Sequence, residues 1–247
     1  MRLLIFILLS ISFNFLITND AVAQNINSSV SKSYRVTAKP EIFEKAFFGG
    51  TQINNDRFPI TFYSVDIGKI NIESGKIIAC DPIVMRDVKP YIEIFPVGQF
   101  AIHLAIAKFN NDERVAFSRI MFSNKPVAKW EFALKKGQSQ VSIFGNTIYS
   151  YGVDGGTGIF VDMKANDAFR DLDIKNENLW QQVFDDEMKK HSHKSWEYTI
   201  YNFDGHNLAA FSTGMGDGHY ATYIGYDDKG NICRLLTDFN LVEWWKK

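Results

Sequence analysis

The chain has 247 residues, with 27 Lys and Arg against 28 Asp and Glu, so its formal net charge is −1. This balance gives no overall positive field that would steer the protein towards nucleic acid or an anionic membrane, and we expect no nucleic-acid partner. Hydrophobic residues make up 46% of the sequence and aromatic residues 15%, which is enough for a substantial core in one domain.

The first 23 residues have the pattern of a cleavable secretory signal. Arg2 comes before an apolar stretch from Leu3 to Ile17, and Ala21-Val22-Ala23 stands before Gln24. The apolar stretch is shorter than the roughly 20 residues of a membrane-spanning helix, which disfavours an uncleaved anchor. Small residues before the cut are typical of signal cleavage. We expect cleavage after Ala23, export to the periplasm or the outside, and no membrane span afterwards.

After the signal, the sequence predicts a flexible lead and then one folded domain. Residues 24–39 are polar and rich in serine, as flexible leads are, and the domain is expected to occupy 40–247. Pro40 begins a short apolar segment that Gly49-Gly50 ends, which predicts a short helix. From about Thr61 the apolar residues recur with a period of two, which predicts strands.

Most of the remaining sequence reads as strands separated by turn signals. Strands are expected over 61–72, 76–80, 91–95, 99–109, 114–122, 140–143, 149–162 as two short runs, 196–203, 208–212, 219–226 and 232–239. The short turn at 96–98 makes 91–95 and 99–109 a predicted hairpin. The segment around Trp130 fits either a strand or a helical turn. The clearly helical region is 164–190, so we predict an α+β fold: a mostly antiparallel, sandwich-like or barrel-like sheet with one helical insertion.

The two cysteines, Cys80 and Cys233, both lie in strand-like runs. Export would permit a disulfide between them. Two small buried hydrophobic side chains are the alternative. The sequence does not give the separation of their Cα atoms, so both interpretations stay open.

The stretch 212–239 contains three glycines at alternate positions, Gly214, Gly216 and Gly218, with Asp217 between the last two. A phosphate-binding loop would need a helix after its glycines, whereas residues 219–226 alternate like a strand. We interpret the glycines as a bend between strands whose backbone adopts positive φ or approaches another group closely. Such a bend can present N–H groups to an anion. Alternatively, Asp217 only stabilises its own turn.

Five aspartates stand at strand ends or beside a glycine. If several met at one end of a sheet, they could bind a hard cation or share acid and base roles. Each could equally cap its own turn, and no dense ligand loop is present, so we assign no metal ligands, and the sequence identifies no particular cofactor. The five are Asp81, Asp154, Asp162, Asp217 and Asp238.

His219 is the candidate for proton transfer, since histidine titrates nearest to neutral pH. Ser212 precedes it, but Ser212-Thr213-Gly214 lacks the flanking glycines of a nucleophile elbow. The candidate polar cluster therefore comprises the five aspartates together with Ser212 and His219.

Five segments in order, at 74–82, 95–100, 114–134, 151–162 and 212–239, resemble the DUF4241 family, a domain of unknown function. The chain departs from the family pattern at Thr213 and Met215, where the family looks more like SGWGDG. The resemblance implies a shared architecture and supplies no reaction, substrate or cofactor.

Two hypotheses for the function follow. In the first, an exported β-rich module binds an unknown small molecule or protein through the glycine bends around Asp154 and Asp217. In the second, the protein is a hydrolase, with or without the assistance of a metal ion, in which clustered aspartates work with His219 as a proton shuttle. They differ in whether the carboxylates gather in one cleft.

Overall fold

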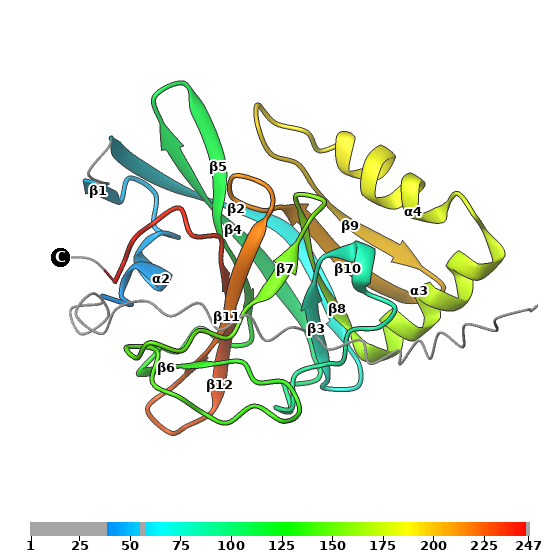
Figure 1. The fold of residues 1–247 in the computed structure, drawn as a ribbon, viewed down its shortest axis with the longest axis horizontal. Helices are drawn as coiled ribbons and strands as arrows, with labels where there is room; N and C mark the ends of the chain where they lie inside the picture. The colour runs from blue at the N-terminus through cyan, green and yellow to red at the C-terminus, as the bar shows by residue number, and fades with distance from the viewer. Residues whose placement is uncertain (1–38, 55–57, 246–247) are drawn as a thin grey trace, which may run out of the picture.

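The structure is a computed structural model that describes residues 39–54 and 58–245 (Figure 1). It contains two antiparallel sheets and a few helices, so the predicted α+β fold, mostly antiparallel β, is confirmed. The predicted signal and most of the flexible lead lie outside the described residues. In the described part, no helix has the length and apolar character needed to cross a bilayer.

The larger sheet is curled like half a barrel. Its strands, in spatial order, are β1 (Gln52–Asn54), β2 (Pro59–Ile72), β4 (Gly98–Phe109), β5 (Asp112–Met121), β12 (Ile232–Asp238), β11 (Gly218–Tyr226) and β6 (Lys129–Phe132), and β7 (Tyr151–Val153) also pairs with β11. The long strand β2 has a register shift at Asp66 and Gly68. Gly68 has a φ of +118°, and a methyl group there would lie 3.1 Å from the Ile200 side chain of the second sheet. Glycine therefore lets the two sheets approach closely.

The second sheet has the order β3 (Ile77–Cys80), β8 (Thr157–Asp162), β10 (His206–Ser212) and β9 (Tyr198–Phe203), and it packs against β2. Successive side chains of a strand point to opposite faces. In β8, Phe160 lies in the core between the sheets, whereas Ile159 and Val161 lie in the core beneath the helices. The strands read as continuous apolar runs because both faces of this sheet are covered.

Helices cover the outer faces. The chain forms α2 (Ile42–Lys45), the 3₁₀ turn η1 (Pro82–Val84), α3 (Met163–Lys175), α4 (Leu179–Gln181) and the π-helical turn η2 (Gln182–Glu187). Figure 1 shows α3 and α4 lying over β9 and β10, far from α2. The predicted helix at 164–190 is present but interrupted, because Asn176 takes extended geometry at the end of α3.

The short helix α2 is held on the larger sheet by one carboxylate. Glu44 accepts hydrogen bonds from Arg119 at 3.2 Å and from Arg234 at 3.1 Å, and both guanidinium groups are largely buried. Burial lowers the pKa of Arg119 to about 10, although the Glu44 carboxylate acts in the opposite direction. A helix of four residues depends on such tertiary contacts, since it is too short to be stable by itself.

The structure corrects two sequence-based expectations and settles two alternatives. Residues 91–95 form no strand, because their N–H groups bond to carbonyls on separate segments, at Ile77, Leu134 and Gly75. Residues 140–143 form no strand either. The segment around Trp130 is a strand, β6. Both cysteines are free and buried, Cys80 in the second sheet and Cys233 in the first.

Candidate functional site

Two glycine bends meet at one end of the β7–β11 pair. Val153 pairs with Gly218, so Asp154 and Asp217 follow directly beyond the last paired residues. The Thr213 N–H donates to the Gly156 carbonyl at 3.0 Å, and a methyl group on Gly156 would lie 3.7 Å from the Gly216 Cα. We call residues 154–157 and 213–217 together the glycine rim.

The surface of the glycine rim is acidic, and hydrogen bonds from buried side chains hold its backbone in place. Asp154 and Asp217 are exposed, and Met215 is 63% exposed. The Tyr220 hydroxyl donates to the Gly216 carbonyl at 2.6 Å, and the Thr213 hydroxyl donates to the same carbonyl at 2.8 Å. Two carboxylates therefore face solvent on a backbone that is already ordered.

Gly214 explains why the rim needs glycine. Its φ is +43°, and a methyl group there would lie 2.6 Å from the carbonyl oxygen of Phe239 and 3.0 Å from the Phe239 Cβ. Its N–H donates to the Val115 carbonyl at 3.1 Å. The backbone approaches its neighbours so closely that a side chain has no room.

Asp81 connects the rim to the 3₁₀ turn η1. One carboxylate oxygen accepts the N–H of Ile83 at 2.8 Å, and the other accepts the N–H groups of Asp154 at 2.8 Å and Gly155 at 2.9 Å. The residue is only 2% exposed. A methyl group on Gly155 would lie 3.1 Å from the Ile83 side chain, so the two segments are also in van der Waals contact.

Ile83 also lines a cavity of about 310 Å³ between η1 and α3. Two polar contacts connect the segment at η1 to α3. Arg86 forms an ion pair with the buried Asp173, and the Asn166 Nδ2 donates to the Met85 carbonyl at 3.1 Å. Asn166 is 4% exposed, and its Oδ1 has no hydrogen-bond partner. The cavity is also lined by Pro82, Phe169, Arg170, Glu177 and Trp180.

The other predicted site residues have structural contacts of their own. Asp162 caps α3 by accepting the Lys164 N–H, and it also binds Ser74, at the end of β8 opposite to the rim. Asp238 accepts the Asn240 N–H and the Trp244 indole N–H.

Ser212 and His219 complete the predicted cluster. The Ser212 hydroxyl bonds to the backbone of Glu197. His219 is exposed on β11, and its ring lies close to Gly152 of β7, where a methyl group would be 3.5 Å from the ring. The structure thus brings Asp81, Asp154 and Asp217 together and places His219 beside them. Among residues 39–54 and 58–245, no group of three or more His, Cys, Asp or Glu side chains could hold a metal ion.

Sequence reasoning did not find the cavity residues. A usable signal was present on α3, where Asn166 and Asp173 share the buried face with Ala165 and Phe169. Polar residues on the apolar face of a helix are seldom buried without a partner or a function. Arg86 lies in the long connection after β3. This connection has no periodic pattern, so no local signal indicated that Arg86 would line the cavity.

These features define a two-sheet antiparallel β protein with a buried carboxylate that joins a glycine rim to a ligand-sized cavity. A family model described as a protein of unknown function, DUF4241, matches residues 70–237, and the chain belongs to that family. Searches of curated proteins and of solved structures gave no match.

Proposed function

We propose that this protein is an exported binding module whose ligand is a planar N–H heterocycle bearing a positively charged amine. The ring occupies the cavity between η1 and α3, and the amine reaches the acidic glycine rim. The unpartnered Oδ1 of Asn166 carries the proposal, because a buried acceptor without a donor costs about 1–3 kcal/mol. A ligand N–H would remove that cost.

The cavity suits a flat, uncharged ring. Its volume of about 310 Å³ lies at the lower end of the range for small-molecule sites. Trp180 and Ile83 give it apolar surface, and both are partly exposed. The two arginines of the walls pair with acids, Arg86 with Asp173 and Arg170 with Asp167 at 3.2 Å, so the cavity offers no unpaired positive charge to the ring.

The rim suits the amine. Asp154 and Asp217 are exposed at the same end of the β7–β11 pair, and Asp81 holds the Asp154 bend against η1. Carboxylates on an ordered backbone bind a cation at a smaller entropic cost than mobile ones. No contact of the predicted aspartates favours the hydrolase alternative, because Asp81, Asp162 and Asp238 accept hydrogen bonds from their own surroundings.

Tryptamine and indole test the proposal as a matched pair, since they share a ring N–H and differ in the charged amine. By ligand-observed NMR we expect both to bind and tryptamine to bind more tightly. Asn166→Leu should weaken both by about tenfold, the value of one hydrogen bond. The double change Asp154→Asn and Asp217→Asn should remove only the advantage of tryptamine.

Asn111→Leu, in the exposed turn between β4 and β5, is the control and should leave binding unchanged. If Asn166→Leu fails to fold, Trp180→Ala replaces it as the cavity variant. The proposal is wrong if neither compound binds the native protein, or if the cavity variant binds both compounds as the native protein does.

Export rests on the predicted signal. We expect the protein recovered from a cell envelope or culture fraction to begin at Gln24, as read by N-terminal sequencing. Replacing Ala21 and Ala23 by leucine should block cleavage, since small residues are required at these positions. Recovery of the native chain with its first 23 residues intact would contradict this part of the proposal.

A further inference from the structure

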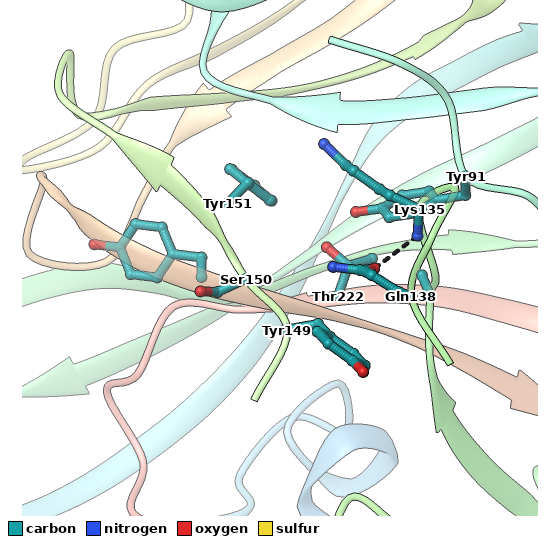
Figure 2. A pocket seen from close by; sticks show the side chains of 9 residues that line it. Tyr91, Lys135, Gln138, Tyr149, Ser150, Tyr151 and Thr222 are labelled. Carbon is teal, nitrogen blue, oxygen red and sulfur yellow. Dashed lines mark hydrogen bonds between the residues drawn. The ribbon is translucent and has the colours of Figure 1, made fainter. Parts of the chain in front are cut away.

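A second, smaller cavity lies at the end of the β7–β11 pair away from the rim, where Tyr151 pairs with Tyr220. Its volume is about 20 Å³, enough for one water molecule. Tyr151 and Tyr220 form its buried side, and Gln138 and Ser150 lie at its partly exposed edge. Figure 2 shows the Lys135 side chain extending into the space between Tyr91 and Tyr151.

The amine of Lys135 has an unusual environment for a lysine. No carboxylate lines the cavity, and within the described residues the amine forms no ion pair. The centroid of the Tyr91 ring lies 6.0 Å from the amine nitrogen. Burial lowers the pKa of Lys135. A larger share of the amine is therefore uncharged near neutral pH than for an exposed lysine, and the uncharged amine is the nucleophile.

The hydroxyl group of Tyr151 is the second reactive feature of the cavity. The residue is 8% exposed, and its hydroxyl has no hydrogen-bond partner in the described structure. Burial raises the pKa of Tyr151 well above its ordinary value, so the hydroxyl stays protonated. It is available to donate a hydrogen bond to an oxygen atom that enters the cavity.

We propose that Lys135 is a nucleophilic lysine that forms an imine with a small aldehyde, whose carbonyl oxygen accepts a hydrogen bond from Tyr151. The amine nitrogen attacks the carbonyl carbon, and the carbonyl oxygen takes a proton to give a carbinolamine. Loss of that hydroxyl group, together with the remaining amine proton, releases one water and leaves a C=N bond. Amine and aldehyde thus give imine and water, and no oxidant or reductant takes part.

Formaldehyde with cyanoborohydride tests this in the full-length protein, because the hydride reduces each imine to a stable methylamine that peptide mass spectrometry can locate. Lys136 is an exposed neighbour and serves as the internal control. At pH 6.5 we expect Lys135 to be methylated several-fold faster than Lys136. The ratio should fall as the pH rises, since the control amine then also loses its proton.

Two variants separate reactivity from simple accessibility. Tyr151→Phe should slow methylation of Lys135 several-fold, leave Lys136 unchanged and not lower the melting temperature, because it removes only an unpartnered hydroxyl. Lys135→Arg should abolish the fast reaction without affecting the other lysines. The proposal is overturned if Lys135 reacts no faster than Lys136 at pH 6.5, or if Tyr151→Phe leaves its rate unchanged.

Discussion

Replacing Asp81 by alanine is expected to lower the free energy of unfolding by about 3–5 kcal/mol. The carboxylate accepts hydrogen bonds from three backbone N–H groups, of Ile83, Asp154 and Gly155, at a site that is 2% exposed. Without it, these donors lose their partner inside the protein, and the 3₁₀ turn and the rim lose the group that joins them. Urea unfolding followed by tryptophan fluorescence measures the change.

Asp217→Ala is the matched control for this experiment. Its carboxylate is exposed, so the change should stay within about 0.5 kcal/mol of the native stability. An Asp81→Ala protein that unfolds at the same urea concentration as the native protein would show that Asp81 does not hold the two segments together.

Gly214→Ala is expected to cost about 3 kcal/mol or more. The new methyl group would lie 2.6 Å from the Phe239 carbonyl oxygen, and because this neighbour is backbone, the rim itself would have to move. Gly230→Ala serves as the control. Gly230 has a φ of +79° with no atom within 4 Å of the added methyl group, so it tests the positive φ without the collision.

For Gly230→Ala we expect a loss of only about 1 kcal/mol. Both variants are compared by thermal unfolding under the same conditions. Equal losses for the two would mean that conformational strain alone, and not the contact with Phe239, fixes glycine at position 214.

The strands and the glycine bends could be predicted because their signals are local. Alternation in 219–226 and 232–239 gave β11 and β12 almost to the residue. The positive φ of Gly214 and Gly216 agrees with the interpretation of that stretch as a bend between strands. The hairpin predicted for 91–95 and 99–109 is wrong, because the N–H groups of residues 91–95 bond to the carbonyls of Gly75, Ile77 and Leu134, which no local pattern indicates.

The roles of the aspartates could not be assigned from the sequence. Asp81, Asp162 and Asp217 have similar neighbours along the chain, yet the first joins two segments, the second caps a helix and the third is exposed. They differ in their tertiary contacts, because each carboxylate accepts hydrogen bonds from different groups or from none. The cavity was missed for the same reason, since η1 and α3 are about 80 residues apart, as the Asn166 bond to Met85 shows.

The central claim is that the cavity and the glycine rim form one binding site joined through Asp81. Chemical-shift mapping with tryptamine on isotope-labelled protein tests it most directly. We expect the side-chain amide of Asn166 to shift together with the backbone amides of Ile83, Asp154 and Gly155, with one common affinity. Shifts confined to one of the two places, or two different affinities, would contradict a single site.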